Sequence, residues 1–251
     1  MPHYGDKKYW EERYKKSKGE TFDWLEEYPT LKKIIDSLKI SKETGKILNV
    51  GCGNSELSEN MYDDGYHNIY NIDISQTVIN LMTERSKNRP GMIYEVMDVC
   101  DLKYENNIFD LIIDKSTMDT LLCGDDYCIN IAKMIKEIQR VLKVGGYYMI
   151  ISYEEPDYRM MHLTRKFLKF NVEVIKIEQK SGNGYDNYHY IYLCKKLEGA
   201  DEISEKYFDE VIKELIEQEE MEEEDDIWQE KNEHKKKEIE NQNMKSNNDN
   251  N

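Results

Sequence analysis

A glycine-rich turn stands between an apolar run and a helical pattern in the first quarter of the chain. Lys46–Val50 reads as a short buried strand, and Gly51 and Gly53 follow it directly before the helical pattern of Ser55–Asp64. Glycine lacks a β-carbon, so such a turn lets a ligand approach the backbone at a helix start. A dinucleotide fingerprint would place a third glycine at position 56. The chain has Glu56 there, whose charge would oppose a pyrophosphate. The turn therefore favours an adenosyl ligand over NAD.

Acidic side chains end the next two apolar runs. Asp73 closes the run 68–73, where a carboxylate can accept hydrogen bonds from both hydroxyls of a ribose. Asp98 follows the run 92–97 and could accept from an adenine amino group, while Val99 offers a backbone N–H. Each aspartate alone also fits a helix cap or a turn. Their order after the glycine turn favours one nucleoside site.

Alternating strand and helix patterns must position these groups. Helices are expected over 6–14, 30–38, 55–64, after Ser75, over 126–143 and over 157–169. Strands are expected over 46–50, 68–73, 92–97, 108–114, 147–153, 171–178 and 188–195. The apolar phase slips between Val174 and Ile175, which suggests a bulge. The turn Ser181–Gly184 joins the last two strands without a helix.

This element order predicts the fold. We expect an α/β, Rossmann-like, doubly wound seven-stranded sheet, mostly parallel with an antiparallel edge strand. Ligands of such sheets bind at the carboxyl ends of the strands, which is where the glycine turn and both aspartates would lie.

Four short motifs resemble one branch of the class I, seven-stranded methyltransferases. They are Tyr9-Trp-Glu-Glu-Arg-Tyr14, Phe22-Asp-Trp24, Gly51-Cys-Gly-Asn-Ser-Glu-Leu-Ser58 and Asp114-Lys-Ser-Thr-Met-Asp119. They are similar to motifs of the enzymes that methylate lysines of translation elongation factor 1-alpha, and of a relative that acts on citrate synthase. The resemblance covers residues 4–196. Ser116 departs from it, because these relatives usually have glycine there.

The resemblance implies S-adenosyl-L-methionine as cofactor. By it, the cofactor contacts fall on Trp10, Tyr14, Trp24, Gly51, Asp73, Ile74, Asp98, Val99 and Lys115, to which the turn itself adds Gly53. Aromatic faces stabilise cations, which suits a sulfonium donor, and Trp10 and Tyr14 lie four residues apart on one helix face. Packing against the core is the alternative role for these aromatic rings.

The implied reaction is methyl transfer to a lysine amine of a protein such as elongation factor 1-alpha. A desolvated pocket would lower the pKa of that amine and help to deliver it neutral. Asp114 and Asp119 are the catalytic candidates, with Tyr153 and Glu154 near the same strand ends. Asp114 could instead bind the amino group of the donor. His189, between two tyrosines, is expected to be structural.

Two other functions stay open. A small-molecule methyltransferase would use the same donor site with a closed substrate pocket. A non-catalytic, donor-binding interaction protein would use the acidic C-terminal segment to recruit a basic partner, although acidic runs are more often solvated segments.

Composition divides the chain at about residue 197. Of the net charge of −16, residues 198–251 carry −13, so no basic nucleic-acid surface is indicated. We expect a methyltransferase domain with an N-terminal helical cap over 1–197, an acidic amphipathic helix over 198–220 and a disordered acidic, Asn-rich tail over 221–251.

Five cysteines without a CxxC pair favour reduced thiols and no zinc. No apolar run is long enough to span a membrane and no secretory signal is present, so a cytoplasmic location is expected. No metal site is expected.

Overall fold

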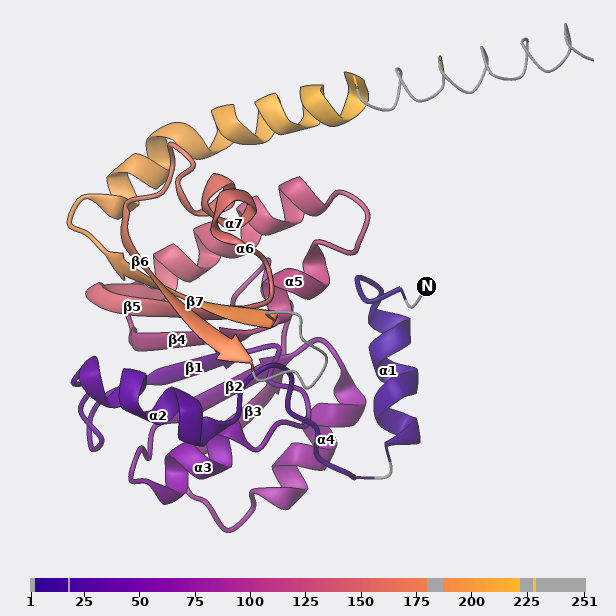
Figure 1. Cartoon of the computed structure of the whole chain (residues 1–251), viewed down its shortest axis with the longest axis vertical. Helices are drawn as coiled ribbons and strands as arrows, with labels where there is room; N and C mark the ends of the chain where they lie inside the picture. The colour runs from indigo at the N-terminus through magenta and orange to yellow at the C-terminus, as the bar shows by residue number, and fades with distance from the viewer. Residues whose placement is uncertain (1–2, 18, 180–186, 222–227, 229–251) are drawn as a thin grey trace, which may run out of the picture. The chain divides into compact units, whose positions relative to one another are not determined.

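One seven-stranded sheet forms the centre of the computed structural model, which describes residues 3–17, 19–179, 187–221 and 228. Its order is β3-β2-β1-β4-β5-β7-β6 (Figure 1). The strands are β1 (Ile47–Val50), β2 (Ile69–Asp73), β3 (Met92–Val96), β4 (Phe109–Lys115), β5 (Leu142–Ser152), β6 (Phe170–Gln179) and β7 (Asn187–Lys196). Strands β1 to β5 pair in parallel, and β7 runs antiparallel to both β5 and β6. The predicted mostly parallel sheet with antiparallel pairing at one edge is confirmed.

Helices cover both faces of the sheet. Those on one face are α2 (Tyr28–Ser37), α3 (Leu57–Asp63) and α4 (Gln76–Arg85); those on the other are α5 (Thr117–Leu121), α6 (Tyr127–Val141) and α7 (Pro156–Leu163) (Figure 1). Helix α1 (Lys7–Lys16) packs beside α4. Because both faces are covered, β1 is buried at all four of its positions. The doubly wound architecture is therefore confirmed, with crossovers that bring the ends of β1, β2 and β4 to one edge.

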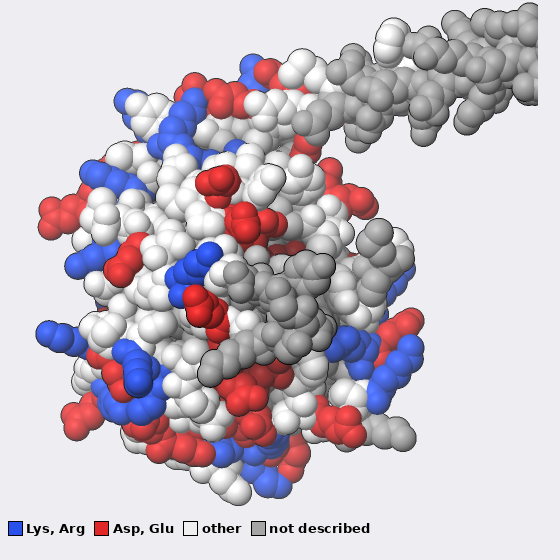
Figure 2. All heavy atoms as spheres, in the orientation of Figure 1, with Lys and Arg blue, Asp and Glu red and all other residues white. Residues whose placement is uncertain are grey.

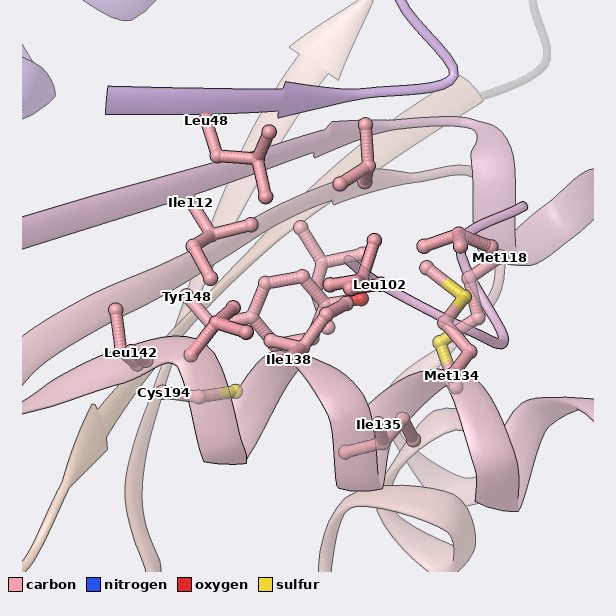
Figure 3. Packing of buried hydrophobic residues seen from close by; sticks show 14 of the residues in the cluster. Leu48, Leu102, Ile112, Met118, Met134, Ile135, Ile138, Leu142, Tyr148 and Cys194 are labelled. Carbon is pink, nitrogen blue, oxygen red and sulfur yellow. The ribbon is translucent and has the colours of Figure 1, made fainter. Parts of the chain in front are cut away.

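Helix α6 supplies much of the core on its face of the sheet. Its apolar stripe, which includes Met134, Ile135 and Ile138, lies against Ile112 and Tyr148 of the central strands (Figure 3). All five side chains are fully buried. A Leu or Ile buried in this way stabilises the fold by about 1.5–3 kcal/mol. This packing fixes β4 and β5 beneath the residues that follow them at the carboxyl edge.

Two predicted helices end earlier in the structure than the sequence pattern suggests. The expected helix 126–143 ends at Val141, and Leu142 already pairs with Phe109 in the sheet. The apolar pattern runs on past Val141 because Leu142 is buried in the strand as it would have been in a helix. The expected helix 157–169 ends at Leu163, where the Thr164 hydroxyl bonds the Met160 carbonyl.

The predicted bulge in the sixth strand is wrong. Strand β6 pairs with β7 in unbroken register from Phe170 to Gln179. Phe170 and Val172 pack on the α6 side of the sheet, whereas Ile175 and Ile177 pack on the α2 side. The slip in apolar phase therefore reflects an edge strand that is apolar on each face in turn and partly exposed on both.

The C-terminal part of the chain forms a second compact unit over residues 210–251, after a first unit over 1–209. A helix covers residues 200–221, so it begins two residues after the start of the predicted acidic amphipathic helix 198–220. Most of the predicted disordered tail and the turn Ser181–Gly184 lie outside the described residues. Within those residues no helix is long and apolar enough to cross a membrane.

A left-handed residue joins β4 to α5. Ser116 has φ of +70°, and its buried hydroxyl has no hydrogen-bond partner among the described residues. A residue with a β-carbon is disfavoured there by about 1–2 kcal/mol, which explains why glycine suits this position. The chain therefore carries local strain at the edge where ligands are expected.

Replacing Ser116 with glycine should raise the free energy of unfolding by about 1 kcal/mol, after the greater chain entropy of glycine is subtracted. Urea denaturation of Ser116→Gly measures it. Ser37→Gly, at the exposed end of α2, should be destabilised in the same assay. Equal loss of stability in the two variants would contradict the assigned strain.

Candidate active site

The glycine turn after β1 forms the floor of a pocket. Gly51 has φ of +58° and Gly53 has φ of +53°, both in the left-handed region. A β-carbon on Gly51 would lie 2.1 Å from Thr117 Oγ1, and one on Gly53 would lie 2.8 Å from the Tyr14 hydroxyl. The turn therefore requires glycine for its backbone conformation and for the close approach of α5 and α1.

Asp73 at the end of β2 holds this turn from the side. Its Oδ2 accepts the Gly53 N–H at 2.9 Å and its Oδ1 accepts the Ser75 N–H at 2.9 Å. The Ser75 hydroxyl in turn caps α4 by accepting the Val78 N–H. Burial raises the pKa of Asp73 to about 6, although the two backbone N–H groups oppose the shift. The carboxylate faces the pocket with lone pairs left to accept ligand hydroxyls.

The third strand ends beside the same pocket. Asp98 is exposed and its Oδ1 accepts the Cys100 N–H at 2.8 Å, while Val99 is buried next to it. This places a carboxylate and an apolar side chain at the distance of one strand from Asp73. The Cys100 thiol is an unsuitable nucleophile, because burial raises its pKa to about 12.

Aromatic rings from α1 and from the segment after it form one wall. Trp10 and Tyr14 stack with their centroids 5.8 Å apart. The Arg13 guanidinium lies 5.8 Å from the Trp10 ring, 5.3 Å from the Phe22 ring and 5.4 Å from the Trp24 ring. Arg13 thus fastens the two aromatic segments together through cation–π contacts.

Residues 20–27, which we call the strap, cross the carboxyl edge of the sheet between α1 and α2. Asn54 donates to the Glu20 carbonyl, and Asp23 accepts from the Ser55 hydroxyl and from the Glu56 N–H. Asn54 and Ser55 belong to the glycine-turn motif, so their role in the structure is to hold the strap.

Lys115 at the end of β4 fastens the strap from the other side. Its Nζ bonds Asp23 Oδ1 at 2.7 Å and the Trp24 carbonyl at 3.1 Å. Burial lowers the pKa of Lys115, and the Asp23 carboxylate opposes that shift. The wall of the pocket therefore contains a buried lysine paired with a carboxylate.

One pocket gathers every residue that the sequence predicted to contact the cofactor. Its lining includes Trp10, Tyr14, Trp24, Gly51, Gly53, Asp73, Ile74, Asp98, Val99 and Lys115. It also includes Tyr4, Asn54 and Thr117, which sequence reasoning missed as site residues. Asn54 and Thr117 stand inside the two most specific motifs, and that signal could have found them.

Asp114, a predicted catalytic residue, lies beneath the pocket and outside its lining. It is fully buried and accepts from the Tyr148 hydroxyl at 2.8 Å and from the Thr117 N–H at 2.8 Å. The Met118 N–H is a third donor, at 3.3 Å. Burial raises the pKa of Asp114 to about 6. These contacts fit a role in capping α5 rather than one in touching a substrate.

Asp119, the second catalytic candidate, holds the turn after β5. It accepts from the Ser152 hydroxyl at 2.7 Å and from the Tyr153 N–H at 3.5 Å, and it pairs with the fully buried Arg159. The pair is made by Nη2 of Arg159, whereas its Nε and Nη1 atoms have no hydrogen-bond partner in the described part of the chain. Asp119 thus neutralises a buried cation and positions Tyr153.

The fold and this edge are similar to those of one class of protein, the methyltransferases of Rossmann-like fold. The family model for a methyltransferase domain matches residues 48–150. A SAM-dependent methyltransferase from Methanosarcina mazei superposes with a TM-score of 0.52 at 17% identity, over 70% of this chain and 99% of that one. The name of that neighbour gives S-adenosylmethionine as its cofactor, which is the cofactor expected for this chain from the sequence.

Within that class the chain is similar to eEF1A lysine methyltransferases. The eEF1A lysine and N-terminal methyltransferase of Mus musculus is 39% identical over 152 residues, which are 59% of this chain and 22% of that protein. EEF1A lysine methyltransferase 4 of Mus musculus is 27% identical over 63% of this chain and 65% of its own length. The chain thus matches about a fifth of the length of the first relative.

Donor affinity should depend on pH through Asp73. Its charged form is the better acceptor for ribose hydroxyls, and its pKa of about 6 lies above the ordinary value for an aspartate. Affinity for S-adenosylhomocysteine should therefore be nearly complete at pH 7 and above and fall about tenfold by pH 5. Calorimetric titration across this range measures it. Asp73→Asn should bind weakly with no pH dependence, and a flat wild-type profile would contradict the role.

Removing the Asp119 carboxylate should destabilise the domain. Asp119→Ala leaves Arg159 buried without its charged partner, which should lower the free energy of unfolding by about 3 kcal/mol. Urea denaturation of Asp119→Ala, Arg159→Met and the double variant gives the coupling between the two. The double variant should recover part of the loss. Additive losses would show that the ion pair has no such role.

Proposed function

We propose that this protein is an S-adenosylmethionine-dependent methyltransferase that modifies a lysine side chain of translation elongation factor 1-alpha. The observation that carries the proposal is the convergence of the ten predicted cofactor residues on one pocket at the carboxyl edge of the sheet. The similarity to proteins named for methylation of eEF1A supports the choice of substrate.

The residues present fit this cofactor. The Gly51–Gly53 turn packs so closely against Thr117 and Tyr14 that it has no space for a β-carbon, and its backbone lines the pocket where the amino-acid end of the donor would lie. Asp73 would hold the ribose hydroxyls, Asp98 the adenine amino group and the Val99 N–H the adenine ring. The aromatic wall of Trp10, Tyr14 and Trp24 would face the sulfonium.

The bound cofactor would supply an electrophilic methyl group on sulfur. The chain's own residues would align the acceptor and exclude water, which the strap and the aromatic wall are placed to do. We assign Asp114 and Asp119 to positioning, because both support the turns that carry pocket residues. The protein partner would be one with an exposed lysine.

The same proposal places the protein in the cytoplasm, where its five free cysteines would stay reduced. The proposed function involves no direct binding to nucleic acid. On the face seen in Figure 2, Lys and Arg side chains are interspersed with Asp and Glu and form no broad basic patch.

Calorimetry with S-adenosylhomocysteine and NAD on wild type and Asp73→Ala tests the donor site. Wild type should bind the adenosyl ligand and not NAD. Asp73→Ala should bind at least about 100-fold more weakly, because two charge-assisted hydrogen bonds are lost.

The acceptor is tested by transfer of a labelled methyl group to purified elongation factor 1-alpha, followed by mass spectrometry of the modified residue. Label on a lysine side chain is the expected outcome. A wild type that binds the donor but labels no lysine would overturn the proposed substrate. Failure of folded wild type to bind S-adenosylhomocysteine would overturn the proposed enzyme.

A further inference from the structure

A buried carboxylate and imidazole lie beside the donor pocket without a role in binding the donor. Glu26, in the strap, and His189, in β7, pair through Oε1 and Nδ1 at 2.7 Å. Their side chains are 6% and 11% exposed. The Gln179 amide also donates to Glu26 Oε1. Within the described chain, neither Glu26 nor His189 lines the donor pocket.

The strand register puts this pair at the carboxyl edge of the sheet. Lys115 of β4 pairs with Ile151 of β5, which in turn pairs with Ile191 of β7. His189 lies two residues beyond Ile191 toward the edge that holds the donor pocket, and its side chain faces the same side of the sheet. Glu26 is two residues from Trp24, which lines that pocket. The Glu26–His189 pair therefore lies on the far side of β5 from the donor pocket, one strand further along the same edge of the sheet.

An exposed aromatic ring covers the imidazole. Tyr153, which follows β5, stacks on His189 with ring centroids 6.3 Å apart and planes at 23°. Tyr153 is 60% exposed, so this ring forms the solvent-facing side of the cluster. Its turn is fixed by the Asp119 carboxylate and by the Tyr192 hydroxyl, which donates to the Glu154 carbonyl at 2.7 Å. Residues of α5 and β7 therefore hold the turn that carries the Tyr153 ring.

We propose that Tyr153, His189 and Glu26 form the acceptor subsite, which receives the primary amine of the substrate lysine. The inference rests on the proposed function and names the residues that serve its second substrate. An aromatic face and a buried carboxylate are the groups that recognise an alkyl ammonium. Donor-binding residues already occupy the ends of β1 to β4, which leaves the β5–β7 end for the acceptor.

His189 has a defined task in this subsite. Because Glu26 engages Nδ1, the carboxylate selects the tautomer with the proton on that nitrogen and leaves the Nε2 lone pair as acceptor. Nε2 takes one proton from the lysine ammonium, giving imidazolium and a neutral amine whose lone pair can accept the methyl group. The imidazolium, stabilised by Glu26, then returns the proton to solvent.

The first test uses wild type alone and needs no activity. Long-range proton–nitrogen NMR of the histidine rings is recorded during titration with the lysine analogue Nα-acetyl-lysine N-methylamide. The ring signals of His189 should shift, and those of His67, which precedes β2 at the opposite edge of the sheet, should not. Shifts absent at His189 would overturn the subsite.

The second test uses variants with elongation factor 1-alpha as substrate. His189→Gln should lower kcat by about 100-fold, the lower end of the range for general base catalysis, and leave the Kd for S-adenosylhomocysteine within threefold of wild type. Glu26→Gln should lower kcat less. His67→Gln is the matched control and should keep the wild-type rate. Added imidazole should restore part of the rate in His189→Gly, which a purely structural histidine would not allow.

Each result separates this inference from the proposed function. Retention of wild-type kcat in folded His189→Gln would overturn the inference and leave the enzyme intact. A wild type that methylates no lysine would overturn the proposed function, while the amine titration would still decide whether His189 binds an alkylamine. If His189→Gln fails to fold, Glu26→Gln and the titration of wild type carry the test.

Discussion

The hydrogen bond from the Gly53 N–H to the buried Asp73 carboxylate is the contact on which the rest of the site depends. It joins the turn after β1 to the end of β2, and the left-handed glycines of that turn make room for Thr117 and Tyr14. Helices α5 and α1 and the strap can therefore pack close together around this contact. The same burial raises the pKa of the Asp73 carboxyl group, and hydrogen bonds from the N–H groups of Gly53 and Ser75 partly offset that rise.

The most distinctive sequence motifs of the chain prove to be largely structural. Asn54, Ser55 and Lys115 hold the strap, while Asp114 caps α5. Ser58 bonds Asn49 and Asn71, which ties α3 to the first two strands beneath the glycine turn. The architecture therefore uses polar side chains to fix the walls of a pocket, in keeping with the proposed methyl transfer, whose main requirement is alignment. Functional motifs and catalytic residues need not coincide.

The methyl donor and the acceptor occupy different ends of the same sheet edge in this proposal. Strands β1 to β4 end at the residues assigned to the donor, and the reversed strand β7 brings His189 to that edge from the opposite direction. Only an antiparallel strand can place its first residues beside the last residues of β5. In this proposal the pairing of β5 with β7 serves the acceptor site in addition to extending the sheet.

The sequence by itself determined the sheet class, the order of the elements and a set of residues that line one pocket, because glycine turns, strand-end aspartates and apolar periods are local patterns. It did not determine where α6 ended, since Leu142 is buried as well in a strand as in a helix, nor that β6 is regular. Tertiary structure alone decided that Asp114 and Asp119 support turns, and that Glu26 meets His189 across 163 positions of the chain. Such partners are set by strand register and strap path, which no local pattern encodes.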